Sequence, residues 1–411
     1  MPDDNLMHVR DRNLPYRVFD ADNHLYETTD AFTRYLPKSM DGVVKYIEIN
    51  GRTKLALRDR ISDYIPNPTF AKVAAPGAWE IDPAAEGGIK DHGPMGRLGL
   101  KPKVIPGVEA FFDPEPRYEL MQDMGIDRTI MWPTLASVLE ERLADDPRTT
   151  CALIHALNQW IHEHWTFNYN DSIFATPIVS LSILDKAIEE IQWVAERGAK
   201  IFLLRVAPVP TYEGRKSFAL PEFDPFWELV QELDLVVGMH SGDSGYTRYT
   251  DEWEGREGAE FLAFAANTSL GFLELASEKN NLVDAMASII GHGLASRFPK
   301  LKFAPVEFQS TWIRPFADKL RAASETKAAF FDEDPYEVFI RNVYIHCFHE
   351  PDPAGLIAET GIPADHLMFG SDFPHPEGMA DPLAYSDLVQ DLPQQDQELI
   401  MGGTLAKIMG V

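Results

Sequence analysis

Cysteine is nearly absent from this sequence, and its scarcity excludes two kinds of site. The 411 residues include only two cysteines, Cys151 and Cys347. Two thiols are too few for a disulfide framework or for a zinc site built from thiolates. The opening residues, Met1-Pro-Asp-Asp-Asn, have neither the basic nor the apolar region of a signal peptide. We therefore expect a cytoplasmic protein with reduced thiols.

Long apolar runs and basic residues are also scarce. No apolar run approaches the roughly 18 residues that a membrane-spanning helix requires. The 37 Lys and Arg residues are outnumbered by 64 Asp and Glu residues, which gives a net charge of −27. Nucleic acids and anionic membranes both require a basic surface, so we expect neither as a partner. What remains is a chain with 45% hydrophobic residues, enough to bury a large core.

Short apolar segments alternate with helical segments along the chain, which predicts an α/β fold with a parallel sheet. Eight such units favour a closed, distorted (β/α)8 TIM barrel over an open doubly wound sheet. The open sheet would also require a glycine-rich phosphate turn after an early strand, and G-x-G-x-x-G does not occur there. The predicted strands lie at about 16–20, 128–133, 173–180, 200–205, 233–240, 301–307, 343–348 and 367–372.

One long stretch interrupts this alternation after the first strand. Asn50-Gly51 lies between two strand-like segments and is a strong signal for a β-hairpin. Residues 66–106 are rich in Gly, Pro and Ala, and this composition indicates a lid over a site or a subunit contact. We therefore predict a single domain over 1–411, with an inserted hairpin and lid segment at about 40–110.

Polar side chains end most of the predicted strands. Asp22 and His24 are two residues apart, so on a strand they point to the same side. A carboxylate and an imidazole are ordinary ligands of a divalent transition metal. In a barrel, the carboxyl ends of the strands carry the chemistry, so several such residues together predict a metal site. The others are Thr134, Arg205, His240, Glu307, His346 or His349, and Asp372.

Four stretches resemble those of a known superfamily. They are Asp20-Ala-Asp22-Asn-His24, Gly238-Met-His240-Ser-Gly242, Arg297-Phe-Pro-Lys-Leu-Lys-Phe303 and Gly370-Ser-Asp372-Phe-Pro-His375-Pro-Glu-Gly378. They resemble the amidohydrolase superfamily, in the subgroup that holds aminocarboxymuconate-semialdehyde decarboxylase, resorcylate-type decarboxylases and many metal-dependent hydrolases. The likeness covers nearly all of the chain outside 40–110. It implies metal-dependent hydrolysis or non-oxidative decarboxylation of a small, carboxylated or cyclic substrate.

The resemblance also implies a ligand set. Asp22, His24, His240 and Asp372 would hold a divalent ion, with zinc expected first and manganese or iron as alternatives. One ion is expected, with two as the alternative. Asp372 would also take or return a proton, with Glu307 and His292 as further catalytic candidates. Arg205, His375 and His346 are the candidates for binding substrate, Arg205 because its guanidinium suits a carboxylate.

Two departures from the family pattern leave other functions open. Asp22 replaces the first histidine of the family's H-x-H, and Glu307 replaces the histidine at the sixth strand. Glu307 could act as a base, or could recruit a second metal together with His292. A second metal would allow a dinuclear iron or manganese oxygenase. Another possible function is that of a non-catalytic partner subunit of an active paralogue. For any of these we expect a homo-oligomer.

Overall fold

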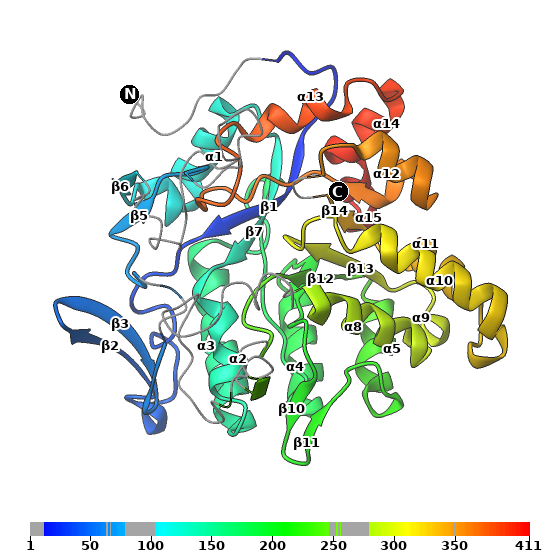
Figure 1. The fold of residues 1–411 in the computed structure, drawn as a ribbon. Helices are drawn as coiled ribbons and strands as arrows, with labels where there is room; N and C mark the ends of the chain where they lie inside the picture. The colour runs from blue at the N-terminus through cyan, green and yellow to red at the C-terminus, as the bar shows by residue number, and fades with distance from the viewer. Residues whose placement is uncertain are drawn as a thin grey trace.

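The computed structural model of the protein describes residues 12–62, 65, 67–78, 103–245, 252–253, 255, 279–347 and 350–411. Figure 1 shows central strands flanked by helices, with the chain coloured from the amino to the carboxyl end. Among the helices of the described ranges, none combines the length and the apolar character that crossing a membrane requires.

Parallel strands form the centre of the fold, in two three-stranded sheets and one two-stranded sheet. The first sheet contains β1 (Phe19–Leu25), β7 (Arg128–Pro133) and β8 (Ile173–Ala175). The second contains β9 (Ile201–Leu203), β12 (Val236–His240) and β13 (Lys302–Val306), and the third contains β14 (Ile345–His346) and β15 (Leu367–Met368). The prediction of an α/β fold with a parallel sheet is confirmed.

Isolated parallel bridges connect these sheets. One bridge joins the first sheet to the second, another joins the second to the third, and the segment after β15 contacts β1. The backbone N–H of Ala21 also donates to the carbonyl of Phe369, at 2.9 Å. The regular β-ladders therefore end at the edge of each sheet, but single β-bridges connect neighbouring sheets. The bridging pairs are Ile178 with Leu203, Phe303 with Val343, and Asn23 with Phe373.

Helices follow most of these strands and lie outside them. Figure 1 shows α3, α4, α5 and α10 flanking the central strands. The helices are α1 (Pro114–Asp123), α2 (Leu139–Arg142), α3 (Pro147–His164), α4 (Leu184–Ala195), α5 (Asp224–Glu232), α8 (Lys279–Gly291), α9 (Leu294–Arg297), α10 (Ile313–Lys327), α11 (Pro335–Asn342), α12 (Pro353–Thr360), α13 (Tyr385–Val389), α14 (Gln394–Glu398) and α15 (Thr404–Met409).

Asp-Pro dipeptides begin several of these helices. The carboxylate of Asp146 accepts a hydrogen bond from the N–H of Thr149 at the start of α3, and Asp352 caps α12 in the same way. The following proline suits the first turn because it has no N–H to leave unpaired and its φ is already helical. These helix starts are therefore encoded locally.

Two apolar clusters fill the interior. The larger lies between strands and helices, whereas the smaller collects residues from the strands themselves. Phe19, Ile130 and Val236 of the smaller cluster pack with Leu405 and Ile408 of the carboxyl-terminal helix α15. Because these residues precede the polar ones on each strand, the strand interior is closed at its amino end. The carboxyl ends of the strands are left for a site.

Trp132 crosses this interior from β7. Its indole N–H donates to the carbonyl of Ala21, at 2.9 Å. A Cβ atom at Gly238 would lie only 2.4 Å from the Trp132 ring. Gly238 of the Gly-Met-His240 stretch is therefore required to let the indole pass, and the close packing fixes the strand that carries His240.

The segment after β1 contains antiparallel strands. Figure 1 shows β2 (Val44–Ile49) and β3 (Arg52–Leu57) at the edge of the molecule. They pair around Asn50, which has φ 52°, so the predicted hairpin is confirmed.

Residues 63, 64, 66 and 79–102 of the predicted hairpin and lid segment lie outside the described residues. The other antiparallel strands are β4 (Arg60–Ser62), β5 (Lys72–Ala74), β6 (Val104–Pro106), β10 (Val209–Thr211) and β11 (Gly214–Lys216).

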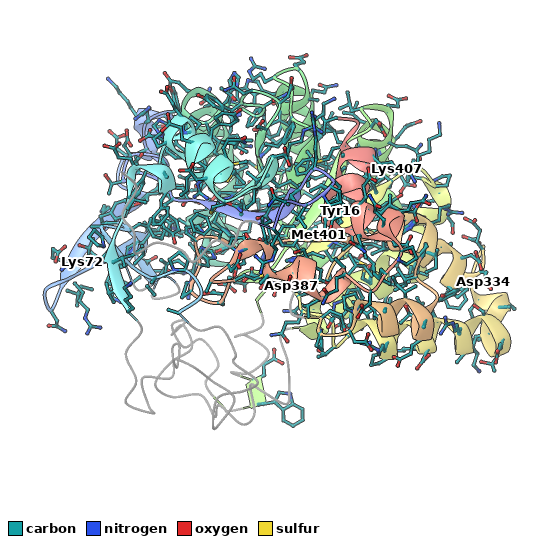
Figure 2. The ribbon with its side chains drawn as sticks, turned by 90° about the horizontal axis from the view of Figure 1, so that it is seen from above. Tyr16, Lys72, Asp334, Asp387, Met401 and Lys407 are labelled. Carbon is teal, nitrogen blue, oxygen red and sulfur yellow. The ribbon has the colours of Figure 1, made fainter. Side chains whose placement is uncertain are left out.

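Figure 2 shows the molecule from above, with Lys72 of β5 and Asp334 before α11 at opposite ends. Figure 1 likewise shows the described strands β2, β3, β5 and β6 on one side of the central strands, away from α10 and α11. The prediction that the segment at about 40–110 belongs to one domain with the rest of the chain stays a prediction.

Candidate metal centre

A buried hydrogen-bond network fixes the carboxyl end of β1. The carboxylate of Asp20 accepts hydrogen bonds from the backbone N–H and the hydroxyl of Ser371 and from the side-chain amide of Asn23. The N–H of Asp372 donates to the carbonyl of Asp22, at 2.7 Å. Gly370 permits this approach, because a Cβ atom there would lie 2.6 Å from the Cβ of Asp22. The first and last strands of the fold are thereby held against each other.

Four predicted ligands converge at this end of the strands. The Nε2 atom of His240 lies 3.1 Å from Oδ1 of Asp22. The Nε2 atom of His24 lies 3.5 Å from the same oxygen and 3.3 Å from Oδ1 of Asp372. One ligand atom each from Asp22, His24 and His240 lies within 4.8 Å of the other two. The structure therefore brings together residues from the first, fifth and eighth predicted strands.

Several of these buried atoms have no hydrogen-bond partner. They are Oδ2 of Asp22, Nε2 of His24 and both carboxylate oxygens of Asp372. Asp22 and Asp372 are both 0% exposed. Burying such groups without partners is costly, and a divalent cation would supply the missing interaction for all of them. The residues present fit a bound metal ion.

Hydrogen bonds to the other ring nitrogens orient both imidazoles. Nδ1 of His240 donates to the carbonyl of Ser241, at 2.8 Å. Nδ1 of His24 lies 3.4 Å from the hydroxyl of Thr134, which itself donates to the carbonyl of Leu25. With the proton on Nδ1, the lone pair of each Nε2 faces the cluster, as metal ligation requires.

The local electrostatics favour the metal-binding forms of two ligands. Burial alone would raise the pKa of Asp22, but the neighbouring imidazoles of His24 and His240 outweigh burial and hold that pKa far below its ordinary value. Burial lowers the pKa of His24 to about 4. At neutral pH these two groups are therefore a carboxylate and a neutral imidazole. Burial raises the pKa of Asp372 well above its ordinary value, so a proton and a cation compete for this carboxylate.

His375 lies beside the cluster. Its ring stacks on that of His24, with 3.8 Å between centroids. Its Nδ1 lies 3.0 Å from Oδ1 of Asp372. His375 also lines the neighbouring cavity, so it connects a buried ligand with the space that a substrate would occupy.

Glu307 and Glu377 bring further carboxylates to the cavity. Glu307 follows β13 in a left-handed backbone conformation, with φ 67°. Its Oε2 lies 3.4 Å from Nδ1 of His240. One oxygen each from Glu307, Asp372 and Glu377 lies within 4.8 Å of the other two. Sequence reasoning missed Glu377 as a site residue, although it stands two residues after His375 in the last motif.

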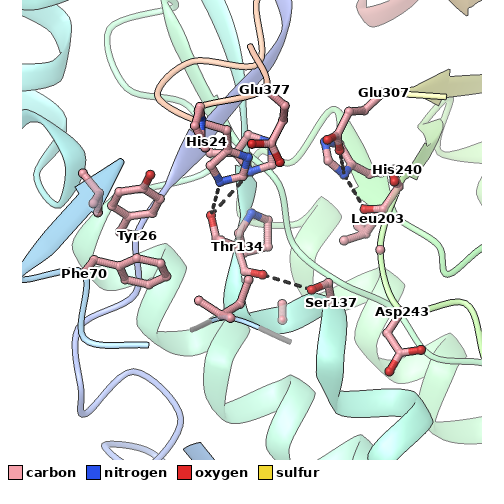
Figure 3. Close-up of a pocket in the computed structure, with 18 of the residues that line it drawn as sticks. His24, Tyr26, Phe70, Thr134, Ser137, Leu203, His240, Asp243, Glu307 and Glu377 are labelled. Atoms are coloured by element: carbon pink, nitrogen blue, oxygen red, sulfur yellow. Dashed lines mark hydrogen bonds and ion pairs between the residues drawn. The ribbon is translucent and has the colours of Figure 1, made fainter. Parts of the chain in front are cut away.

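A cavity of about 490 Å³ lies over the cluster. Figure 3 shows Tyr26 and Phe70 on one side of it and His240 with Glu307 on the other. The Tyr26 and Phe70 rings stack with 4.0 Å between centroids. The cavity thus has an aromatic wall facing a polar one. The residues that line it include Ile65, Val73, Thr134, Ser137, Glu140, Ile178, Leu203, Arg205, Val206, Asp243 and Glu377.

Arg205 follows β9 and lines this cavity, as expected of a residue that contacts substrate. Its Nη2 pairs with Glu141, and its Nε donates to the carbonyl of Asp243, at 2.9 Å. Its Nη1 is buried and has no hydrogen-bond partner. The guanidinium is therefore held in place by protein contacts and keeps donor capacity.

Besides the buried ligand candidates Asp22 and Asp372, two predicted residues do not line the cavity. His346 is buried behind Asp22, with its Nδ1 3.4 Å from Oδ2 of Asp22 and its Nε2 donating to the carbonyl of Gly370. His292 is exposed at the end of α8, where its Nδ1 contacts the hydroxyl of Ser288. The chain from His292 leads through α9 to the amino end of β13, whereas the cluster lies at the carboxyl ends. His349 lies outside the described residues.

Comparisons with known proteins agree with this geometry. Residues 20–410 match the family described as Amidohydrolase. An amidohydrolase of Mycobacterium avium subsp. paratuberculosis K-10 is 32% identical, with a TM-score of 0.85, over 97% of this chain and 100% of that chain. No curated protein matches the chain.

Two decarboxylases share the fold at lower identity. The 2,6-dihydroxybenzoate decarboxylase from Rhizobium is 17% identical, with a TM-score of 0.55, over 73% of this chain and 89% of that chain. The 5-carboxyvanillate decarboxylase of Novosphingobium aromaticivorans, solved with bound manganese, is 17% identical, with a TM-score of 0.57, over 98% and 100% of the two chains. The chain belongs to the amidohydrolase family and is an enzyme of the hydrolase or carboxy-lyase type.

Proposed function

We propose that the protein is a metal-dependent hydrolase of a small cyclic substrate. The observation that carries this proposal is the convergence of Asp22, His24, His240 and Asp372 beneath a cavity that a small molecule can enter. A bound divalent ion would polarise a carbonyl group and lower the pKa of a coordinated water. Zinc, manganese or iron all suit a set of two imidazoles and two carboxylates.

The same proposal includes the finer architecture. We infer that the three parallel sheets are arcs of one distorted (β/α)8 barrel, because bridges join each sheet to the next and return to β1. The segment at about 40–110 would then be an insertion within a single domain. Residues Lys72, Val73 and Ala74 of β5 line the cavity, which supports a role for this segment as a wall or lid over the substrate.

Two carboxyl groups are positioned to move protons. Glu307 lines the cavity beside His240, where it can accept a proton from a nucleophilic water. One oxygen of Asp372 lies within 4.8 Å of an oxygen of Glu307, and the raised pKa of Asp372 suits a group that returns a proton to the departing oxygen or nitrogen. His375 contacts Asp372 from the cavity side and can pass that proton outward.

The charge of the cavity favours hydrolysis over decarboxylation. Glu140, Asp243, Glu307 and Glu377 all line it. A substrate carboxylate placed beside the cluster would approach like charges, whereas a neutral lactone or cyclic amide would not. A volume of about 490 Å³ fits a molecule with one or two rings, and the Tyr26 and Phe70 wall offers it an apolar face. Arg205 can bind a polar or anionic group at the far end of the substrate.

The test supplies the full-length enzyme with zinc or manganese and presents lactones, cyclic amides and hydroxybenzoates. Acid release from lactones is followed with a pH indicator, ring opening of the cyclic amides by chromatography, and release of carbon dioxide by gas analysis. We expect hydrolysis of a cyclic carbonyl compound, and its loss in Asp372→Asn. Carbon dioxide release from a hydroxybenzoate would contradict hydrolysis and favour a carboxy-lyase. Circular dichroism of the variant checks that it is folded.

A second candidate function is a dinuclear iron or manganese oxygenase. The cluster of Glu307, Asp372 and Glu377 favours it, because carboxylate-rich sites suit paired iron or manganese ions. It predicts oxygen consumption that depends on substrate. The complete ligand set and the family both speak against a non-catalytic partner subunit. Purified protein that holds no metal after growth in supplemented medium would favour that alternative instead.

A further inference from the structure

Two buried polar atoms from residues that line the cavity have no hydrogen-bond partner among the described residues. They are Nη1 of Arg205, which follows β9, and Oδ2 of Asp243, which follows β12. The two residues are adjacent, because Nε of Arg205 donates to the carbonyl of Asp243, at 2.9 Å. Figure 3 shows Asp243 well apart from His24 and Glu377. The pair therefore lies at the end of the cavity away from the metal-ligand cluster.

The contacts that these two side chains do make hold them in place. Nη2 of Arg205 pairs with Glu141, a carboxylate that also binds Nη2 of Arg215, at 3.0 Å. Oδ1 of Asp243 accepts a hydrogen bond from the N–H of Gly245, at 3.1 Å. One donor of Arg205 and one acceptor of Asp243 are left over, and they do not bond to each other. Because unpaired buried polar groups are costly, a bound group that pairs with both would be stabilised.

The charges around this pair favour a neutral group. Glu141 already pairs with both Arg205 and Arg215. Glu140 lines the same cavity and adds a second carboxyl group beside Asp243. A substrate carboxylate would therefore approach like charges, whereas a substrate cation would approach the guanidinium of Arg205. A neutral group with both a donor and an acceptor avoids either repulsion.

We propose that the substrate carries a neutral group that both accepts and donates a hydrogen bond, such as a ring hydroxyl, and that Arg205 and Asp243 bind it together. The hydroxyl oxygen would accept from Nη1 of Arg205, and the hydroxyl hydrogen would be donated to Oδ2 of Asp243. The inference rests on the proposed function. It narrows the substrate class to cyclic carbonyl compounds with a hydroxyl group at the end away from the metal. Arg205 and Asp243 would determine specificity and would not contact the bond that breaks.

The protonation state of Asp243 decides which partner it selects. Burial raises the pKa of Asp243, and the neighbouring guanidinium of Arg205 opposes this rise. As a carboxylate, Asp243 accepts the hydrogen bond of a hydroxyl group. A protonated Asp243 would donate instead, and would select a carboxylate or an ether oxygen. The substituent that binds most tightly therefore distinguishes the two forms.

The experiment compares four tetralones, two-ring ketones that cannot be hydrolysed. They differ only in the substituent para to the carbonyl group, which is hydrogen, hydroxyl, methoxy or carboxylate. Each is titrated by calorimetry into full-length protein loaded with Mn²⁺, at neutral pH, where the hydroxyl is largely un-ionised. We expect hydroxytetralone to bind about 10-fold to 100-fold more tightly than the methoxy and unsubstituted compounds, and the carboxylate to bind most weakly.

Two matched variants assign the preference to Asp243. Asp243→Asn keeps an oxygen for the N–H of Gly245 and replaces the free acceptor with an amide donor. The ratio of hydroxytetralone to methoxytetralone affinity should fall to about 1. The unsubstituted ketone should bind as it does to the wild type, which also shows that the variant is folded. Asp234→Asn is the control, because Asp234 is exposed before the other end of β12 and pairs with Lys302. It should keep the wild-type ratio.

The outcomes separate this inference from the proposed function. Equal binding of the four ketones, tightest binding of the carboxylate, or no binding of any ketone would overturn the inference. A hydroxyl preference that survives in Asp243→Asn would show that another group supplies the acceptor, which also overturns the assignment. Lactone hydrolysis without a hydroxyl preference overturns this inference alone. A hydroxyl preference in an enzyme that hydrolyses no cyclic carbonyl compound overturns the proposed reaction and leaves the binding pair assigned.

Discussion

At the scale of single residues, a buried arginine orders the strand that carries two of the ligands. Arg117 of α1 is 0% exposed. Its guanidinium donates to the carbonyls of Ala110 and His24, at 2.6 and 2.8 Å, and to the side chain of Asn23, at 2.6 Å. It also lies over the Phe373 ring, 4.9 Å from the centroid. One side chain thus fixes the backbone of His24 and the segment after Asp372 together.

Replacement of Arg117 by lysine should weaken metal binding without removing a ligand. An ammonium group cannot reproduce the planar set of donors that reaches three acceptors. We expect the affinity for the metal to fall by about 10-fold to 100-fold, the range typical when a residue supporting a ligand is lost. Competition with a coloured chelator measures this. Arg128→Lys, at the amino end of β7, is the control and should bind as the wild type does.

A second prediction concerns Glu27, a carboxyl group that is 1% exposed. Its Oε1 accepts hydrogen bonds from the N–H groups of Leu135 and Ala136, and burial raises its pKa from an ordinary 4.5 to about 7. Between these pH values the folded state binds more protons than the unfolded state. The free energy of unfolding therefore falls as pH rises from 4.5 to 7, and the loss persists above pH 7.

Glu27→Gln keeps an acceptor oxygen for both N–H groups and removes the titration. Relative to wild type, the variant should gain about 3 kcal/mol of unfolding free energy between pH 4.5 and pH 8. Urea denaturation at the two pH values measures the difference. An equal difference between variant and wild type at both pH values would show that Glu27 ionises normally.

At the scale of elements, the sequence predicted most strands and helices but not all of their contacts. Helix starts such as Asp146-Pro147 and the hairpin at Asn50 depend on neighbouring residues, so pattern reasoning found them. Glu377 was missed because its position depends on a folded loop in which the N–H of Met379 donates to the carbonyl of Ser371. His292 was misplaced because closeness to a strand in sequence does not tell which end of the strand a residue meets.

The identities of the candidate ligands could also be proposed from local sequence patterns. Asp22 and His24 follow from strand alternation, and His240 and Asp372 from motifs at strand ends. Neither source gives the distances among them. Those depend on contacts such as the hydrogen bond between the N–H of Asp372 and the carbonyl of Asp22, which joins residues from opposite ends of the chain.

Packing between β7 and β12 gives a third prediction. Gly238→Ala would place a Cβ atom 2.4 Å from the Trp132 ring, so either the indole or the strand must move. We expect a loss of about 1–3 kcal/mol of unfolding free energy, the usual effect of overpacking, and weaker metal binding because His240 shifts. Gly291→Ala is the matched control, since nothing lies within 4 Å of its added atom, and it should leave thermal stability nearly unchanged. Normal stability of Gly238→Ala would argue against this close contact.

At the scale of the whole molecule, the metal ion should stabilise the fold. The cluster joins β1, β12 and the segment after β15, which are far apart in the sequence. Removing a metal ion that binds only the folded state lowers the free energy of unfolding by about 4 kcal/mol, when the free ion is present at a thousand times its dissociation constant. We therefore expect a chelator to lower the melting temperature of the wild-type protein by several degrees in a thermal scan.

Asp372→Asn serves as the comparison for this prediction. It removes one ligand, so its melting temperature should respond little to the chelator. An equal response in both proteins would mean that the chelator acts on some other site. No response in the wild type would mean that the cation contributes little to folding.

The position of α15 affects both the path of substrate and product and the choice of terminus for a purification tag. Leu405, Ile408 and Met409 of α15 seal the strand interior from below. Within the described residues, we therefore expect reactants and products to pass through the cavity beside His240 and Tyr26. An affinity tag fused after Val411 would disturb the packing of α15 against the strands. A tag placed ahead of Met1 is therefore the safer choice for purification.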